Sequence, residues 1–156
     1  MVRAEQLVEM LGQAKALYYQ LILVAAPAGS GKTGVLQELS NLTSAPLINV
    51  NLELSRRMLE LTEQQRVLKV RQLLDEIVDG VAGEVVLLDN IEILFDTRLQ
   101  QDPLTLLQKL SRNKTIVAAW NGTAAGGYLT YAAPEHHEYR RYPVRDFLVA
   151  EPAAAK

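Results

Sequence analysis

The chain has 156 residues, a formal net charge of −2 and a hydrophobic content of 49%. This composition excludes a disordered polymer and a collagen-like chain, and it indicates a globular protein with a buried core. The absence of cysteine excludes disulfide scaffolds, zinc–cysteine sites and thiol catalysis. The near-neutral charge gives no sign of binding to nucleic acid or membrane through bulk charge.

The first fifty residues predict a helix and then a buried strand. Apolar residues between positions 3 and 19 recur at the spacing of an amphipathic helix, so we expect an N-terminal helix within 1–19. Residues 21–25 form a short apolar run before a glycine-rich turn, which is typical of a strand buried on both faces. The longest apolar stretch, 16–28, is shorter than the ~20 residues that cross a bilayer, and its polar start is unlike a signal peptide. We therefore expect a cytoplasmic protein.

Apolar strands and helical segments alternate along the rest of the chain. Strands are predicted at 46–50, 84–89, 115–120 and 128–131, and helices at 32–41, at 53–79 with a break near Thr62, and from Asp102-Pro103 onward. This alternation predicts a three-layer α/β fold with a mainly parallel, five-stranded sheet. We expect one domain over 1–156, with a loose tail at 150–156. Ligands of such sheets bind at the carboxyl ends of the strands.

The strongest motif follows the first predicted strand. Residues 26–33 match the Walker A pattern G-x-x-x-x-G-K-S/T, except that Ala26 replaces the first glycine. Gly29 and Gly31 allow the backbone amides to cradle phosphate, while Lys32 reaches the β- and γ-phosphates and Thr33 binds Mg²⁺. A chance glycine-rich turn is the alternative, and the strand before and helix after it argue against that. We expect ATP and Mg²⁺ as ligands, and these nucleotide-binding residues: Ala28, Gly29, Ser30, Gly31, Lys32, Thr33 and Gly34.

Two later strands also end in polar residues. Asp89 follows four apolar residues, as in a Walker B motif, and is expected to bind Mg²⁺ together with Thr33. Asn121 follows the strand 115–120 and is expected to contact the γ-phosphate or the attacking water. The alternative for Asn121 is a turn, because Asn-Gly is a strong turn dipeptide. This arrangement resembles the core of AAA+ ATPases, in which the asparagine is called sensor 1.

The chain departs from the AAA+ pattern next to Asp89. AAA+ proteins usually carry glutamate there, whereas this chain has Asn90, whose amide cannot act as a general base. Glu92 and Glu53 are candidate substitutes, and the alternative for each is a solvated surface carboxylate. The sequence also shows no C-terminal helical lid of the AAA+ kind.

Several arginines are candidates for a finger that completes the site of a neighbouring subunit, above all Arg112, Arg140 and Arg141. For each of them the alternative is a solvated or structural arginine. His136 and His137 lack further ligands at metal-binding spacing, so no separate metal site is expected there.

Residues 48–57, 87–92, 110–113, 120–122, 129–132 and 138–142 resemble the BrxF family of small P-loop proteins from type 3 BREX phage-defence systems. The resemblance implies a cytoplasmic, nucleotide-binding component of a multi-protein defence system, with other BREX components as partners. It also implies that Asn90 belongs to the family pattern.

These observations favour an ATP-binding protein with slow or partner-stimulated hydrolysis that forms a homo-oligomer. One alternative is a nucleotide-gated scaffold that does not hydrolyse ATP, which Asn90 favours. Another is a subunit that contacts DNA through Arg56-Arg57 or Arg140-Arg141.

Overall fold

The computed structural model describes residues 2–132 and 138–151. Its helices are α1 (Ala4–Ala14), α2 (Lys32–Thr43), α3 (Val50–Met58), α4 (Glu63–Asp79) and α5 (Pro103–Leu110), with the 3-10 helices η1 (Ile91–Phe95) and η2 (Thr97–Leu99). Its strands are β1 (Leu21–Ala26), β2 (Leu47–Asn49), β3 (Val85–Asp89), β4 (Thr115–Ala125), β5 (Tyr128–Tyr131), β6 (Arg140–Pro143) and β7 (Leu148–Ala150). The histidine pair 136–137 and the tail 152–156 lie outside the described residues.

Five parallel strands form the centre of the sheet, in the order β2-β3-β4-β1-β7. The register places Ala26 of β1 beside Asn121 of β4, and Asn49 of β2 beside Asp89 of β3. The carboxyl ends of these strands therefore meet at one edge, which is the edge expected to hold the ligand. The prediction of an α/β fold with a mainly parallel sheet is confirmed.

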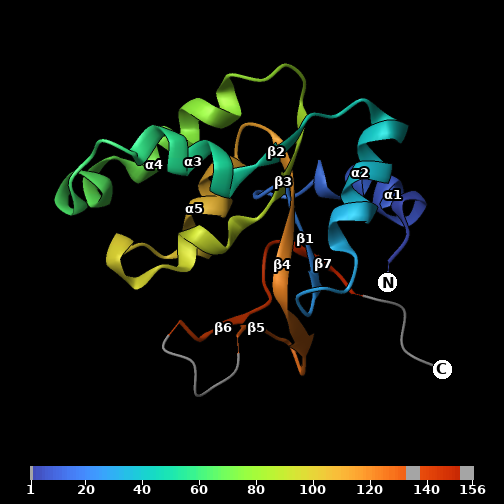
Figure 1. The fold of residues 1–156 in the computed structure, drawn as a ribbon. Coiled ribbons are helices and arrows are strands. Elements are labelled where there is room, and N and C mark those ends of the chain that lie inside the picture. Colours follow the sequence, from blue (N-terminus) through green and yellow to red (C-terminus); the bar gives the residue numbers. More distant parts are fainter. Residues whose placement is uncertain (1, 133–137, 152–156) are drawn as a thin grey trace.

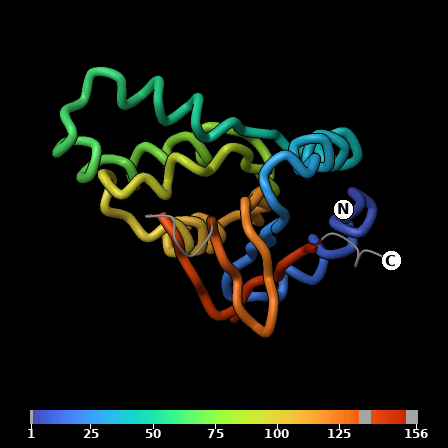
Figure 2. The backbone as a smooth tube through the Cα atoms, turned by 60° about the horizontal axis from the view of Figure 1, so that its bottom comes forward, coloured from blue at the N-terminus to red at the C-terminus, as the bar shows by residue number. Residues whose placement is uncertain are grey.

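Helices cover both faces of the sheet (Figure 1). Along β1 the alternate residues Leu21, Leu23 and Ala25 join one apolar core with helices α3, α4 and α5, while Ile22 and Val24 join a second core with α1 and α2. Figure 2 shows α3 and α4 on one side of the strands and α1 and α2 on the other. Burial on both faces explains why β1 is continuously apolar instead of alternating.

The structure corrects two predicted elements at the ends of the chain. The N-terminal helix ends at Ala14 and not near residue 19, because the amides of Ala16 and Leu17 bond back by three residues and tighten into a turn. The fifth parallel strand is β7, which pairs with β1, whereas β5 is antiparallel to β4. The strand β7 is apolar but only three residues long, which is too short for its pattern to have predicted a strand.

A hairpin extends the sheet beyond its parallel part, since β4 runs on to Ala125 and pairs with β5, which pairs with β6. Gly122 lies within β4, so the Asn121-Gly122 turn interpretation is wrong. A Cβ at Gly122 would overlap the carbonyl oxygen of Thr130, which also accepts a hydrogen bond from Trp120 Nε1 at 2.9 Å. This glycine is required by the close approach of β5, because any side chain would push the two strands apart.

The predicted break in the long helical segment is confirmed. Thr62 caps α4: its hydroxyl accepts the Gln65 amide at 3.1 Å and the Gln65 side chain accepts the Thr62 amide at 2.9 Å. Asp102 occupies the N-cap position of α5, but its carboxylate accepts the hydroxyl groups of Thr105 and Tyr142 instead of a helix amide. No helix in the described part of the chain combines the length and the apolar character that crossing a membrane requires.

Candidate functional site

The loop between β1 and α2 has the backbone of a phosphate cradle. Gly29 and Gly31 have φ values of 78° and 94°, in the left-handed region that favours glycine, and Gly31 is the N-cap of α2. A Cβ on either glycine would meet no atom within 4 Å, so conformation and not crowding requires them. Ala26 lies in β1 outside the left-handed region, which explains why alanine is compatible with this position. The loop and the helix N-terminus together favour a bound anion.

Lys32 lies against the base of this loop, and only 6% of its surface is exposed. Its ammonium donates hydrogen bonds to the carbonyl oxygens of Ala26 and Pro27, both at 2.8 Å. Burial lowers the pKa of Lys32, whereas the nearby carboxylates of Glu92 and Asp89 raise it. The ammonium is therefore held beside the cradle, within a site that also contains two carboxylates.

Thr33 and Asp89 meet at the carboxyl ends of the strands. The Thr33 hydroxyl donates a hydrogen bond to Asp89 Oδ2 at 2.6 Å, and the backbone N–H of Asn90 donates one to Asp89 Oδ1 at 2.9 Å. A hydroxyl and a carboxylate oxygen at this separation are the hard ligands that Mg²⁺ prefers, with water and phosphate oxygens completing its coordination. The donor set thus fits the magnesium ion that the Walker motifs imply.

Asn90 lines the same pocket, and its left-handed backbone conformation turns the chain sharply after Asp89. It has φ 55° and ψ 51°, a left-handed conformation that asparagine adopts more readily than most residues, and it is the N-cap of η1. The turn of η1 then brings Glu92 back to the pocket. Position 90 thus brings an amide to the pocket, and a carboxylate lines it two residues later.

Glu92 lies between the Walker residues and β4. Its Oε2 accepts a hydrogen bond from Asn121 Nδ2 at 2.9 Å. Burial raises the pKa of the Glu92 carboxyl and the negative charge of Asp89 adds to this effect, while the charge of Lys32 opposes it. A half-buried carboxylate with a raised pKa, fixed by an amide, has the properties of a general base.

The phosphate-binding loop, the Walker B aspartate and these two polar side chains enclose one pocket of about 190 Å³. The described residues that line it are Ala28, Gly29, Gly31, Lys32, Thr33, Asp89, Asn90, Glu92 and Asn121. Ser30 and Gly34 lie on the outer side of the loop, where they line a second cavity, of about 630 Å³. The structure therefore brings together all of the predicted loop residues except Ser30 and Gly34, and it adds Asp89, Asn90, Glu92 and Asn121 to them.

Glu53 lies elsewhere, on helix α3. It pairs with Arg57 at 2.7 Å and with Arg56 at 3.7 Å, and the hydrogen bond from Arg57 lowers the pKa of its carboxyl. It lines a cavity on the α3–α4 side with Arg57 and Glu76, and it is not among the described residues that line the Lys32 pocket. The structure does not bring Glu53 to this pocket.

The three candidate arginines also lie outside the described lining of the Lys32 pocket. Arg112 precedes β4, at the amino ends of the strands, and lies 4.2 Å over the ring of Tyr18. Arg141 lies 3.7 Å over the ring of Tyr128, and Arg140 donates to the carbonyl of Gln101 at 3.4 Å. In the described structure, none of these three arginines lies where it could contact a nucleotide bound at Lys32 of the same chain.

The second cavity includes residues that sequence reasoning missed. Arg3 and Glu5, at the start of α1, line it together with Gly31, Gly34 and Glu38. The amphipathic pattern predicted the helix α1 but could not show that its first turn lies beside the phosphate loop. Only the packing of α1 against α2 places these charged residues there.

Comparison with known proteins gives a family match over most of the chain. Residues 22–121 match the model of the ATPase family associated with various cellular activities (AAA). A solved structure of C. elegans PCH-2 is 21% identical, with a TM-score of 0.41 over 74% of this chain, and the chain spans 36% of the length of that one. No curated protein shows significant similarity to the chain.

Proposed function

Because the chain belongs to the AAA family of ATPases, we propose that it binds ATP with Mg²⁺ at Lys32 and hydrolyses it slowly, with Glu92 as general base. One observation carries this proposal: Lys32, the Thr33–Asp89 pair and the Glu92–Asn121 pair line the same pocket. These side chains supply a cation for phosphate, oxygen ligands for a metal ion and a carboxylate for water.

The roles follow from the chemistry of each group. Amides of the loop at Gly29 and Gly31 bind the phosphate oxygens, and Lys32 exchanges its carbonyl partners for the β- and γ-phosphates. Thr33 and Asp89 hold Mg²⁺, and the bound ion neutralises part of the negative charge of the phosphates. Glu92 accepts a proton from the attacking water, while the Asn121 amide orients the carboxylate.

Slow or partner-stimulated turnover is proposed on two grounds. Asn90 cannot accept a proton at the position next to Asp89. Glu92 reaches the pocket from η1 with its carboxylate hydrogen-bonded to Asn121. A contact that moves η1, and Glu92 with it, closer to the attacking water is therefore expected to raise the rate.

The nucleoside is proposed to occupy the 630 Å³ cavity beside Gly34. Lys32, Asp89 and Glu92 mark the γ-phosphate end of the site, so the nucleoside must leave the loop at the other end. This cavity shares Gly31 with the phosphate pocket and is bounded by Val35 and by the carboxylate of Glu38. Val35 offers an apolar surface to the base, and Glu38 can accept hydrogen bonds from ribose hydroxyl groups.

The wider role that we propose is a component of a BREX-type phage-defence system that acts in the cytoplasm with other proteins of that system. The resemblance to the BrxF family supports it, and so does the nucleotide pocket. Self-association is part of the proposal, because Arg112, Arg140 and Arg141 lie away from their own chain's phosphate pocket and could act on another copy.

A nucleotide-gated scaffold that binds ATP without hydrolysing it is the second candidate function. The amide of Asn90, at the position where AAA+ proteins usually carry the catalytic glutamate, favours it. The two functions share the binding site and differ only in whether Glu92 activates water.

Thermal unfolding with and without Mg-ATP tests the binding that both functions require. A ligand at a hundredfold excess over its Kd stabilises the folded state by about 2.7 kcal/mol, which raises the Tm of a domain of this size by roughly 5–10 °C. Lys32→Ala should abolish this shift, and Lys69→Ala, at an exposed position on α4, should retain it. A wild-type protein whose Tm responds to neither ATP nor GTP would contradict the proposal.

A further inference from the structure

The ring of Tyr131 is buried beside the 3-10 helix that carries Glu92. Tyr131 lies on β5 and is 6% exposed, and its ring stacks on Phe95 of η1 with centroids 3.5 Å apart. Burial raises the pKa of Tyr131 to about 12, and the negative charges of Glu92 and Glu138 add to this effect. The phenol therefore lies near the Glu92 carboxylate and stays protonated at neutral pH. Tyr131 is not among the described residues that line the phosphate pocket, so it can act there only through a neighbour.

The geometry of η1 couples Phe95 to Glu92. A 3-10 helix has three residues per turn, so side chains three residues apart lie one above the other on the same side. Glu92 and Phe95 therefore share one side of η1, while the buried Ile91 and Leu94 share another. A shift or rotation of Phe95 must carry the Glu92 side chain with it.

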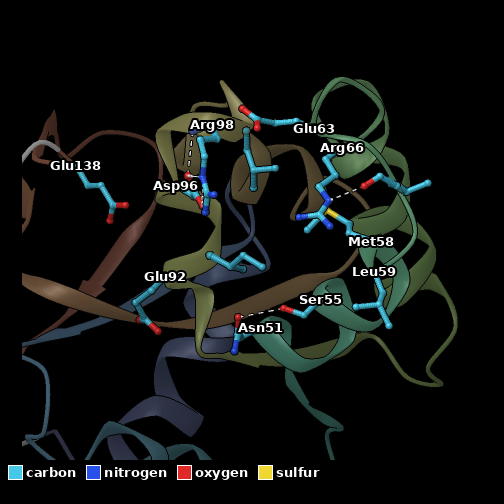
Figure 3. A pocket seen from close by; sticks show the side chains of 13 residues that line it. Asn51, Ser55, Met58, Leu59, Glu63, Arg66, Glu92, Asp96, Arg98 and Glu138 are labelled. Atoms are coloured by element: carbon cyan, nitrogen blue, oxygen red, sulfur yellow. Dashed lines mark hydrogen bonds and ion pairs between the residues drawn. The ribbon is translucent and has the colours of Figure 1, made fainter.

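Open space lies on the α3 side of η1. The groove there has a volume of about 720 Å³, and Glu92 is among the described residues that line it. In the close-up of this groove (Figure 3), the Glu92 side chain projects from η1 away from Ser55 of α3. Because a 3-10 helix has poor hydrogen-bond geometry of its own, η1 depends on side-chain packing. Tyr131 supplies that packing to Phe95 as a parallel stack.

Tyr131 is itself held in place by β4. Gly122 lies opposite Tyr131 in the antiparallel ladder, and Trp120 meets the tyrosine ring edge-on, with centroids 5.9 Å apart. The indole N–H of Trp120 donates to the carbonyl of Thr130, the residue before Tyr131, at 2.9 Å. The ring is therefore a fixed surface against which Phe95 packs.

We infer that Tyr131 is a positioning residue for ATP hydrolysis: its ring holds Phe95, and through η1 it holds the Glu92 carboxylate where it meets the attacking water. This inference rests on the proposed function of Glu92. The Walker A and Walker B residues hold Mg-ATP from other elements. Tyr131 should therefore affect kcat and leave nucleotide binding unchanged.

Leucine variants of the two stacked rings test the inference in the whole chain. Tyr131→Leu and Phe95→Leu each remove the stack, and kcat should fall by ~10- to 100-fold in each, because misplacing a reacting group by about 1 Å can cost about 10²-fold in rate. The double variant should lose no more than either single variant, since both act through one contact. Mg-ATP should still raise the Tm of each variant by the wild-type amount. Tyr131→Phe keeps the ring and should turn over ATP at the wild-type rate.

Phe147→Leu is the matched control. Phe147 is buried in the same core, but among the described ring contacts none joins it to Phe95 or Tyr131. This variant should lose stability and keep its kcat. Hydrogen exchange of the amides of residues 91–95 adds a measurement that needs no hydrolysis. Exchange there should become faster in Tyr131→Leu and stay unchanged in Phe147→Leu.

Any of four results would overturn the inference: wild-type kcat in Tyr131→Leu, an equal loss of kcat in Phe147→Leu or in Tyr131→Phe, losses that multiply in the double variant, or unchanged exchange in residues 91–95. If Tyr131→Leu does not fold, Phe95→Leu tests the same stack by the same criteria. The proposed function fails separately, through wild-type turnover in Glu92→Gln. If the wild type does not hydrolyse ATP, the exchange measurement still decides whether Tyr131 holds η1.

Discussion

Asn90 and Glu92 show how one backbone conformation relocates a functional group. A residue in the left-handed region cannot continue a strand or begin an ordinary helix, so the chain turns sharply after Asp89. The 3-10 turn that follows places Glu92 in the pocket. The sequence offered Glu92 and Glu53 as equivalent substitutes. Only the turn at Asn90 and the ion pairs of Glu53 with Arg56 and Arg57 distinguish them.

The raised pKa of Glu92 predicts the pH dependence of turnover. A general base works only when deprotonated, so turnover should fall as the pH drops through this pKa, which lies above the ordinary glutamate value of about 4.3. The folded state also holds this proton more tightly than the unfolded state. Glu92 therefore adds most to the free energy of unfolding at pH values below about 4.3, and this contribution is lost as the pH rises through the folded-state pKa.

A profile of kcat against pH measures this effect directly. An acid limb in the ordinary glutamate range, or a limb that persists unchanged in Glu92→Gln, would assign the titration to another group. The nearby charges of Asp89 and Lys32 shift the pKa of Glu92 in opposite directions, and the pKa of Tyr131 is raised by burial and in turn by Glu92.

At the scale of elements, packing between η1 and the β4–β5 hairpin supports the segments that carry Glu92 and Asn121. Phe95 at the end of η1 stacks on Tyr131 of β5, with ring centroids 3.5 Å apart and planes 9° apart, and Trp120 of β4 meets both rings edge-on. Trp120 directly precedes Asn121, and Phe95 lies three residues after Glu92. The hydrogen-bonded Glu92–Asn121 pair is thus anchored on both sides by one buried aromatic cluster.

The strand at 128–131 was predicted, but sequence reasoning could not predict that β4 continues past Trp120 and pairs with it as an antiparallel hairpin. Residues 115–120 are continuously apolar and the Asn-Gly dipeptide favours a turn, so the strand was expected to end at Trp120. The long-range approach of β5 overrides this local preference, because Thr130 accepts the indole N–H of Trp120 and leaves room only for glycine at position 122. Thr62, in contrast, was predicted correctly as a cap because all the groups of a capping box lie within four residues.

Gly122→Ala tests this account of the hairpin. The added Cβ would overlap the carbonyl of Thr130, so we expect a loss of about 1–3 kcal/mol in the free energy of unfolding, as for other overpacked sites. Gly12→Ala is the matched control: Gly12 lies in α1 with open space around it, and alanine should stabilise that helix by roughly 0.5–1 kcal/mol. Urea unfolding followed by Trp120 fluorescence measures both. Equal stability of Gly122→Ala and the wild type would refute the crowding argument.

For the whole molecule, the parallel sheet could be predicted and its last strand could not. The strands β1, β3 and β4 are apolar because helices cover both of their faces, and such runs are recognisable in a sequence. The strand β7 has three residues and lies at the edge of the sheet, where it pairs only with β1 among the described strands. Three residues are too few for an apolar pattern that distinguishes a strand. The alternation of strands and helices predicted a parallel sheet whose strands all end at the same edge. The phosphate loop, Asp89 and Asn121 follow such strand ends, so the sequence could place them together.

Self-association should depend on nucleotide. Arg112 lies at the amino ends of the strands, opposite the phosphate loop, and Arg140 and Arg141 do not line the pocket described around Lys32. These three arginines can reach a nucleotide held at Lys32 only from a second copy, so Mg-ATP is expected to increase the mass measured by sedimentation. Lys32→Ala should remove the increase. A wild-type protein that stays monomeric at saturating Mg-ATP would contradict this part of the proposal.

The measurement that bears most directly on the central claim is ATP turnover by Glu92→Gln, paired with its affinity for Mg-ATP. Glutamine keeps the shape and the hydrogen bonding of the side chain but cannot accept the proton of water. We predict that Mg-ATP still raises the Tm by the wild-type amount, while kcat falls by about 10²–10⁴-fold, the usual contribution of a general base. Glu53→Gln, which removes a carboxylate outside the pocket, should leave kcat unchanged. Wild-type turnover in Glu92→Gln would contradict the assignment of Glu92 as the base.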